Sequence, residues 1–269
     1  MSSGTPHGSS PVAGDDGVRP GVGAPSRAGR APRRLRRILA LDDLEPAARR
    51  QLPRPVFGFV AGGAETATSR RGNRAAYGDY HFIPRMLIET TTRSQTTTLF
   101  DQCFRAPFGI APMGGTVLAA YQGDIVLARA AAKAGIPFVL SASSLIPMER
   151  VVQANPDAWF QAYLPGEPDR IAASVARVAA AGFGVFVLTV DLPVPGNREN
   201  NIRNGFSLPL QPSVRLARDG MMRPRWLLGN AVRTLSRTGM PHFENMDAMR
   251  GPPILSSNTQ YVPSAVGMV

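Results

Sequence analysis

The stretch Val185–Phe206, VFVLTVDLPVPGNRENNIRNGF, decides the fold. Its first six residues, Val185–Val190, form an apolar run that is rich in β-branched side chains and too short for an ordinary helix. This run predicts a fully buried parallel strand. Polar and charged residues follow, from Thr189 and Asp191 to Arg198. Polar groups at the carboxyl end of a buried parallel strand are typical of the site in an α/β barrel or a doubly wound sheet. A solvated loop after the strand is the alternative.

The same pattern recurs upstream at regular spacing. Apolar strand candidates begin near Pro107, Pro137, Ala158 and Gly184. Three helices are expected between them, because apolar residues recur at helical spacing and two of the segments end before a glycine. These helices are Asp124–Ala134, Met148–Ala154 and Asp169–Ala181. The order βαβαβαβ predicts a parallel sheet with right-handed crossovers.

Each strand candidate ends in small or polar residues. The first leads into Ala111-Pro112-Met113-Gly114-Gly115, which lacks the G-x-G-x-x-G spacing and so disfavours a dinucleotide-binding Rossmann unit. The later strands deliver Ser141, then Gln161 and Tyr163, then Thr189 and Asp191. Polar groups at the carboxyl ends of successive strands favour a (β/α) barrel that collects its site from many strands. Capping of the following helices is the alternative.

Length, composition and net charge limit the classes of protein to which this chain can belong. The chain has 269 residues, 43% of them hydrophobic, which is enough for one large domain. The single Cys103 cannot form an intramolecular disulfide, which fits a reducing compartment, and we expect a cytoplasmic protein. No apolar run approaches the ~18 residues of a membrane span. The net charge of +11 raises nucleic acid or an anionic surface as partners.

Residues 1–37 form an arginine-rich tail with a net charge of +5, from seven arginines and two aspartates. We expect this tail to be disordered, because it offers little apolar surface to offset its ordering entropy. A secretory signal is disfavoured, since the apolar run Ile38–Leu41 is shorter than the ~7–15 residues that a signal needs. Residues 38–105 predict a helical lead-in, with helices at Leu44–Arg50 and Thr66–Tyr77 and an extended stretch at 80–105.

An ordered series of short motifs in this chain resembles the FMN-dependent α-hydroxy-acid oxidases and dehydrogenases, the family of glycolate oxidase and L-lactate dehydrogenase. The motifs are Gly62–Glu65, Asn73, Pro84-Arg85, Ile110–Pro112, Leu140-Ser141, Trp159–Tyr163, Thr189–Asp191, Gly196, Arg198-Glu199 and Gly205-Phe206. The resemblance implies a (β/α)8 TIM barrel. Residues 106–196 would be its first four βα units, and the domain would run from residue 38 to 269.

The resemblance also implies a role for each site residue. Pro112, Met113 and Gly114 would present backbone to the flavin ring of FMN. Ser141, Gln161 and Thr189 would hydrogen-bond its polar edge. Tyr163 and Arg198 would bind a small (S)-2-hydroxy acid, with Arg198 pairing the carboxylate. Asp191 would orient a histidine base during oxidation to the 2-keto acid. No metal is implied, and the electron acceptor is left open.

The sequence departs from the family in its substrate-facing residues. Phe59 stands where the family usually has a tyrosine that hydrogen-bonds the substrate carboxylate, and Asn197 replaces an arginine found beside Arg198 in many members. A hydrogen bond to a charged group is worth roughly 1.5–3 kcal/mol. We therefore expect weaker substrate binding, or a larger and less polar acid.

A second departure is that the family's later barrel strands have no clear counterpart. A barrel of this kind needs about 250 residues, and residues 197–269 are expected to be an active-site loop excursion with a truncated end. The only lysine, Lys133, is expected to face solvent, and His242 is expected in a loop rather than as the base. We therefore expect a partial barrel that is inactive by itself, holds FMN poorly and forms a homo-oligomer if completed.

Residues 207–250 raise the question of a membrane surface. Trp226–Leu228 and Val232–Leu235 predict an amphipathic helix among arginines, and membrane-associated members of the family bind lipid through this region. A solvated loop is the plainer alternative. A non-catalytic basic protein that binds nucleic acid or an anionic membrane is the alternative function. The family resemblance itself implies no nucleic-acid partner but leaves peripheral membrane contact possible.

Overall fold

The computed structural model describes residues 35–164, 166–190 and 196–255. The chain divides into two compact units, Met1–Leu44 and Glu45–Val269. In the first unit, the described residues form two 3-10 turns, η1 (Leu35–Arg37) and η2 (Leu41–Asp43). Of the tail expected at residues 1–37, only η1 lies within the described residues.

Three short helices follow. α1 spans Leu44–Gln51, α2 spans Arg54–Ala61 and α3 spans Thr68–Ala75, which the 3-10 turn η3 (Ala76–Asp79) extends. Pro53 separates α1 from α2 because proline lacks a backbone N–H and restricts the residue before it. The helices expected at Leu44–Arg50 and Thr66–Tyr77 are therefore present, although the second is shorter than predicted and ends in a 3-10 turn.

The stretch expected to be extended, residues 80–105, ends in a hairpin that the sequence did not predict. Strands β1 (Thr97–Leu99) and β2 (Gln102–Phe104) pair antiparallel. The two loop residues between them, Phe100 and Asp101, have φ values of 50° and 61°. Positive φ at both loop residues is the geometry of a type I′ turn, for which asparagine and glycine are the usual residues. Neither residue is present here, so the sequence carries no hairpin signal.

The parallel sheet consists of β3 (Val139–Ser141), β4 (Trp159–Ala162) and β5 (Phe186–Leu188), in that order. The strand expected near Pro107 is reduced to one parallel bridge between Ile110 and Phe138. Four chain segments therefore run parallel in the predicted order. This order matches the first βα units expected of a TIM barrel, and the sheet of the described residues is small and open.

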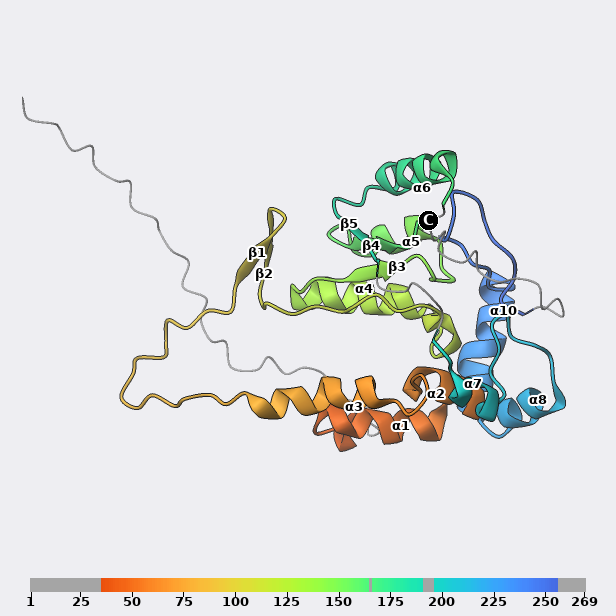
Figure 1. Ribbon diagram of the computed structural model, residues 1–269, viewed down its shortest axis with the longest axis horizontal. Coiled ribbons are helices and arrows are strands. Elements are labelled where there is room, and N and C mark those ends of the chain that lie inside the picture. Colours follow the sequence, from red (N-terminus) through yellow and green to blue (C-terminus); the bar gives the residue numbers. More distant parts are fainter. Residues whose placement is uncertain (1–34, 165, 191–195, 256–269) are drawn as a thin grey trace, which may run out of the picture. The chain divides into compact units, whose positions relative to one another are not determined.

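The three crossover helices lie close to their predicted positions. α4 spans Gly123–Ala134, α5 spans Met148–Val152 and α6 spans Pro168–Ala181. Gly135 and Gly182 follow α4 and α6 with φ values of 66° and 97°, the left-handed geometry in which glycine ends a helix. Figure 1 shows the three strands lying between α4 and α6.

The prediction that Val185–Val190 is fully buried was wrong. Leu188 is 53% exposed and Val190 is 85% exposed, whereas Phe160 on the neighbouring β4 is 1% exposed. The difference arises because β4 has a strand on each side, while β5 lies at the edge of the described sheet. An apolar run therefore identified the strand correctly but not its position in the sheet.

The chain after the sheet is largely helical. α7 spans Glu199–Asn204 and α8 spans Val214–Met221. A longer helix then runs through α9 (Pro224–Trp226), the π-helical segment η5 (Leu227–Val232) and α10 (Arg233–Thr238). This confirms the helix expected around Trp226–Leu235. Its Trp226 Nε1 donates to the Leu118 carbonyl oxygen at 2.7 Å, which anchors the helix to the 3-10 turn η4 (Thr116–Leu118).

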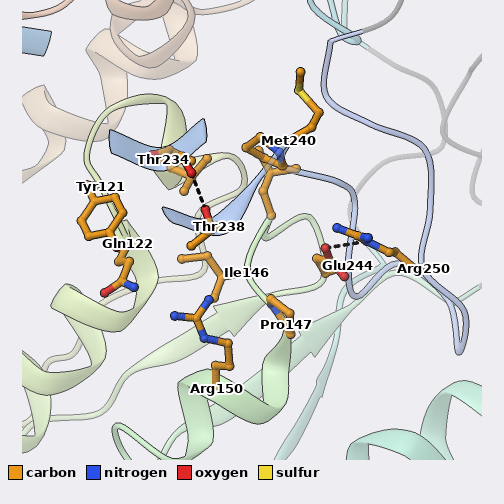
Figure 2. Close-up of a pocket in the computed structure, with 13 residues that line it drawn as sticks. Tyr121, Gln122, Ile146, Pro147, Arg150, Thr234, Thr238, Met240, Glu244 and Arg250 are labelled. Carbon is orange, nitrogen blue, oxygen red and sulfur yellow. Dashed lines mark hydrogen bonds and ion pairs between the residues drawn. The ribbon is translucent and has the colours of Figure 1, made fainter. Parts of the chain in front are cut away.

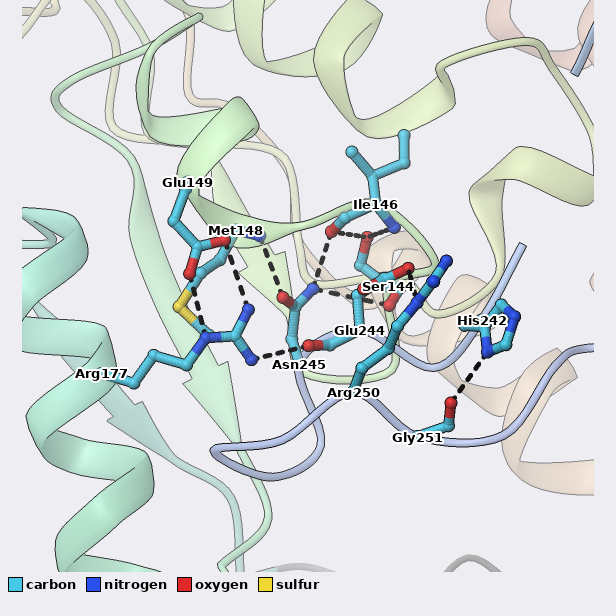
Figure 3. A network of polar contacts seen from close by, with 10 residues as sticks. All are labelled: Ser144, Ile146, Met148, Glu149, Arg177, His242, Glu244, Asn245, Arg250 and Gly251. Atoms are coloured by element: carbon cyan, nitrogen blue, oxygen red, sulfur yellow. Dashed lines mark hydrogen bonds and ion pairs between the residues drawn. The ribbon is translucent and has the colours of Figure 1, made fainter. Parts of the chain in front are cut away.

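Residues 240–255 pack onto α5 and α6 through buried polar contacts (Figure 3). Asn245 Oδ1 accepts from the Met148 backbone N–H at 2.9 Å, and its Nδ2 donates to the Ile146 carbonyl oxygen at 2.8 Å. Arg177 of α6 donates to Glu149 Oε1 at 2.9 Å and to the Glu244 carbonyl oxygen at 2.7 Å. Phe243 and Ile254 of the same segment are buried in the hydrophobic core, so the segment is part of the core.

Candidate functional site

Three uncharged polar side chains meet at the carboxyl end of the parallel sheet. Ser141 of β3 lies opposite Gln161 of β4, and both are buried. Gln161 pairs in register with Val187 of β5, so Thr189, two residues further on, points to the same face. Gln161 Nε2 donates to Thr189 Oγ1 at 2.8 Å. The structure therefore brings together the three residues predicted to bind the flavin edge.

The predicted flavin-facing segment, Pro112–Gly114, lies at the same end of the sheet. It follows Ile110, which bridges to Phe138 just before β3. The Gly115 backbone N–H donates to the Ser143 carbonyl oxygen at 3.2 Å. A Cβ at Gly114 would lie 2.8 Å from Ser143 Cβ, so glycine is required for this close approach. Pro112, Met113 and Gly114 are all exposed.

A second group of predicted residues meets where α2 faces α7. Phe59 of α2 stacks on Phe206, with ring centroids 4.3 Å apart and planes inclined by 14°. The guanidinium carbon of Arg198 lies 5.8 Å from the centre of the Phe59 ring, within cation–π range. Arg198 is exposed at the N-cap position of α7. Two of the three residues predicted to face the substrate, Phe59 and Arg198, are therefore neighbours.

Two asparagines hold α7 against α2, and the sequence analysis missed both. Asn200 Nδ2 donates to the Gly58 carbonyl oxygen at 2.6 Å, and Asn204 Oδ1 accepts from Arg54 Nε of α2 at 3.0 Å. A Cβ at Gly58 would lie 2.6 Å from Asn204, and one at Gly62 would lie 2.2 Å from Asn200 Nδ2. The sequence did offer one signal for this contact. Asn200 and Asn204 are four residues apart, as are Gly58 and Gly62, and this spacing places each pair on one helix face.

The turn before α3 fixes the chain that leads into Arg198. The Glu65 backbone N–H donates to the Asn197 carbonyl oxygen at 2.9 Å. A Cβ at Gly196 would lie 3.3 Å from Ala64 Cβ. The Gly62–Glu65 motif therefore contacts the Gly196–Arg198 motif, although more than 130 residues separate them in the sequence.

The remaining predicted residues are less informative. Tyr163 directly follows β4 and is half-buried. Asp191 lies outside the described residues, so its predicted role stays a prediction. Lys133 is exposed on α4, as expected. His242 lies in a loop, where its Nδ1 is 2.9 Å from the Gly251 carbonyl oxygen, so the nitrogen carries a hydrogen and donates it.

A buried carboxyl group lies against the loop that follows β3. Asp124, at the start of α4, is 2% exposed and accepts a hydrogen bond of 2.5 Å from Ser144 Oγ. Burial raises the pKa of Asp124, and the bond from Ser144 partly opposes this shift. Ser144 in turn accepts from the Ile146 backbone N–H at 3.1 Å. These hydrogen bonds hold the loop after β3 against the start of α4.

The donor set at the sheet end fits the polar edge of a flavin. A flavin ring is planar and uncharged at most of its edge, and it presents both hydrogen-bond donors and acceptors. A serine, a glutamine and a threonine can each donate or accept. The bond from Gln161 to Thr189 uses one of the amide's two hydrogens, which leaves donor and acceptor capacity for a ligand. Among the described residues, no cluster of three or more histidine, cysteine or acidic side chains could hold a metal ion.

Residues 48–258 match the FMN-dependent dehydrogenase family. The chain belongs to this family. A putative L-lactate dehydrogenase from Mycobacterium tuberculosis (strain ATCC 25618 / H37Rv) is 43% identical over 196 residues, which cover 72% of this chain and 47% of that protein. The (S)-mandelate dehydrogenase of Pseudomonas putida is 32% identical over 209 residues, covering 77% of this chain and 52% of its own length.

Solved structures agree with these sequence matches. The crystal structure of a monotopic membrane protein, (S)-mandelate dehydrogenase, superposes with a TM-score of 0.68 at 33% identity, over 76% of this chain and 53% of that one. A mandelate oxidase structure gives a TM-score of 0.61 at 36% identity, over 63% of this chain and 51% of that one. This chain thus spans about half the length of the relatives that it matches.

Proposed function

We propose that this chain takes part in the FMN-dependent oxidation of an (S)-2-hydroxy acid to the 2-keto acid. The observation that carries the proposal is the alignment of Ser141, Gln161 and Thr189 on three adjacent parallel strands beside the exposed segment Pro112–Gly114. The relatives of this chain include dehydrogenases named for lactate and mandelate, which are both 2-hydroxy acids.

The side chains at the sheet end would hold the flavin by its polar edge. When bound, FMN supplies the acceptor for the two electrons that leave the hydroxy acid. Ser141 and Gln161 are buried, so a hydrogen bond from either to a ligand would be shielded from water and positioned in advance. The exposed segment Pro112–Gly114 leaves room for a flat ring beside them.

Arg198 would bind the substrate carboxylate. Its guanidinium group is exposed and lies over the Phe59 ring, 5.8 Å from the ring centre. A cation–π contact at an exposed site is worth about 0.5–1 kcal/mol, so the side chain can turn toward a carboxylate at small cost. A planar guanidinium can make two parallel hydrogen bonds to that carboxylate. Phe59 offers the acid an apolar ring and no hydroxyl group, which favours a larger, less polar substrate.

The base that removes the substrate proton is not assigned to a described residue. His81 lies in the extended segment before β1, and His242 is bonded to Gly251. We therefore propose that this chain binds FMN weakly and does not turn over by itself.

A flavin titration tests the proposal on the purified chain. FMN fluorescence should be quenched saturably, and a redox dye should stay oxidised with L-lactate, (S)-mandelate or glycolate. Dye reduction would show that the chain contains a working base. Absence of FMN binding, together with salt-sensitive retention of DNA, would instead support a non-catalytic basic protein.

A second candidate function is contact with an anionic membrane. On the helix that runs from Pro224 to Thr238, Leu228 is 65% exposed, Val232 46% and Leu235 49%. Their i, i+4, i+7 spacing places them on one face. Arginines of the same region could favour acidic lipids: Arg215, Arg218, Arg223, Arg225, Arg233 and Arg237. No described helix is long and apolar enough to cross a membrane.

Vesicle flotation tests this contact. The chain should float with vesicles that contain phosphatidylserine, and the triple variant Leu228→Ser, Val232→Ser, Leu235→Ser should float at least about fivefold less, because the exposed apolar face supplies the insertion energy. A matched variant, Val214→Ser on the exposed side of α8, should float like the wild type. Equal flotation of the triple variant would exclude this face.

A further inference from the structure

A small pocket lies away from the residues assigned to flavin and substrate. It has a volume of about 120 Å³ and is enclosed by the turn before α4, the start of α5 and the C-terminal end of α10 (Figure 2). Its polar lining includes Tyr121, Gln122, Thr234 and Thr238. None of the predicted flavin or substrate residues lines it.

The pocket carries an uncompensated positive charge. Arg150 lines it from α5, and no described carboxylate lies within ion-pair distance of its guanidinium group. The neighbouring Glu149 is engaged by Arg177 at 2.9 Å. The other lining arginine, Arg250, is paired with Glu244 at 2.9 Å. In Figure 2 the Arg150 side chain rises from α5 toward Gln122 and Ile146.

A further cation adds to the potential of the pocket. The guanidinium carbon of Arg233 lies 4.2 Å from the centre of the Tyr121 ring, which itself lines the pocket. Among the described residues, three guanidinium groups thus lie in or next to the pocket, and Glu244 supplies the one carboxylate that lines it. Charges of one sign in a cleft with low-dielectric walls attract a ligand of the opposite sign.

The rest of the lining is apolar. Leu145, Ile146, Pro147 and Met240 form much of the wall, and Leu145 and Ile146 are buried. Drug-sized ligands occupy pockets of roughly 300–1,000 Å³, so this pocket is too small for them. A cavity of about 150 Å³ can hold a molecule the size of benzene. The size and lining therefore suit an anionic group attached to a short apolar body.

We propose that this pocket binds a small organic carboxylate, with its oxygens on Arg150 and its apolar tail against Ile146 and Met240. Arg150 is exposed and can present two parallel N–H groups to a carboxylate. The site is separate from Arg198, and the proposal does not depend on the oxidation chemistry.

Methionine methyl NMR tests the proposal directly, because Met240 lines the pocket and reports on its occupancy. The full chain, labelled with ¹³C at its methionine methyl groups, is titrated with propionate, propionamide and inorganic phosphate at constant ionic strength. The Met240 signal, assigned with Met240→Leu, should shift saturably with propionate. The exposed Met249 serves as the reference for non-specific effects of the added salt.

The comparison of the three probes separates the possible ligands. Propionate should bind at least about tenfold more tightly than propionamide, which lacks the charge, and more tightly than phosphate, which lacks the apolar tail. Equal affinity for propionate and phosphate would overturn the assignment to a carboxylate with an apolar tail. Absence of a saturable Met240 shift with any probe would overturn the site itself.

Two arginine variants complete the test. Arg150→Gln should weaken propionate binding at least about tenfold. Arg129→Gln, at an exposed arginine of α4 that does not line the pocket, should leave it unchanged. Arg198→Lys should also leave the Met240 titration unchanged, which separates this pocket from the proposed substrate site. A wild-type affinity in Arg150→Gln, with an unchanged circular dichroism spectrum, would refute the role of Arg150.

Discussion

The two parts of the candidate site are built in opposite ways. At the sheet end, Ser141 and Gln161 are buried and uncharged, and Gln161 is bonded to Thr189 on the next strand. Between α2 and α7, Arg198 is exposed and charged, and it rests on the Phe59 ring. The first part is fixed by backbone pairing within the sheet, and the second by ring stacking and by hydrogen bonds between loops and helices.

This difference corresponds to two different tasks. A cofactor that stays bound benefits from donors that are held in place before it arrives, because no ordering cost is then added on binding. A substrate that enters and leaves in every cycle needs a group that can reach the solvent. The sheet end therefore suits the flavin edge, and the α2–α7 contact suits the carboxylate.

Truncating a phenylalanine to alanine in each part of the site should give the largest difference in the free energy of unfolding. Phe160→Ala removes a ring that is 1% exposed within the sheet, and Phe59→Ala removes a half-buried ring that stacks on Phe206. We expect Phe160→Ala to lower the free energy of unfolding by about 3–5 kcal/mol. Phe59→Ala should lower it by about 1–2 kcal/mol. Urea unfolding measures both, and equal losses would contradict the contrast between a sheet core and a surface contact.

Substitution of Gly62, the residue that directly follows α2, should give the next largest loss of stability. Gly62→Ala would place a Cβ 2.2 Å from Asn200 Nδ2 and 2.6 Å from the Gly58 carbonyl oxygen, and so displace the bond that holds α7. We expect a loss of about 1–3 kcal/mol in unfolding free energy. The control, Gly72→Ala on the exposed side of α3, meets no atom within 4 Å and should be stabilising by about 0.5–1 kcal/mol. A neutral Gly62→Ala would show that α7 does not depend on this close approach.

Substrate binding should depend on the guanidinium geometry of Arg198. In the FMN-loaded chain, Arg198→Lys should weaken binding of (S)-mandelate, followed by flavin fluorescence, at least about tenfold, or roughly 1.4 kcal/mol. Arg203→Lys is the matched control, because Arg203 lies on the same helix and pairs with Glu199 at 3.4 Å. If both variants bind mandelate equally well, Arg198 does not bind the carboxylate.

A smaller effect is expected from Asp124, whose pKa is raised by burial. Since the folded state then binds the proton more tightly than the unfolded chain, the stabilisation from protonated Asp124 is present at acid pH. It is lost as the pH rises through the raised pKa. Asp124→Asn keeps an acceptor for the Ser144 hydroxyl and cannot titrate. The unfolding free energy of the wild type, relative to this variant, should therefore fall as the pH rises from the ordinary range of an aspartate pKa, about 4, toward neutral. A constant difference across that range would contradict the raised pKa.

Local patterns in the sequence predicted much of the fold. The helices α4, α5 and α6 and the strands β3, β4 and β5 were found from periodicity and glycine positions. The turn at Phe100-Asp101 was missed, because its residues carry no turn signal and the backbone conformation is set by its surroundings. The exposure of β5 was missed because burial depends on neighbouring strands, which a run of apolar residues does not specify.

The candidate site was predicted unevenly for the same reason. Strand ends and the family resemblance indicated Ser141, Gln161 and Thr189, whose proximity follows from the parallel register. The contacts of Asn200 with Gly58, and of Asn245 with Ile146, join residues about 100 or more positions apart. A single sequence gives no measure of such distances, so these positioning residues could be identified only in the structure.

The most direct test of the account measures FMN affinity after the sheet-end donors are changed. Gln161→Leu removes the amide and keeps a similar volume, and Thr189→Val removes the hydroxyl with little change in shape. Each should weaken FMN binding about five- to tenfold, or ~1–1.4 kcal/mol, as measured by flavin fluorescence quenching. Gln153→Leu, at an exposed glutamine after α5, should leave the affinity unchanged. Wild-type FMN affinity in folded Gln161→Leu and Thr189→Val would contradict the claim that this edge of the sheet holds the flavin.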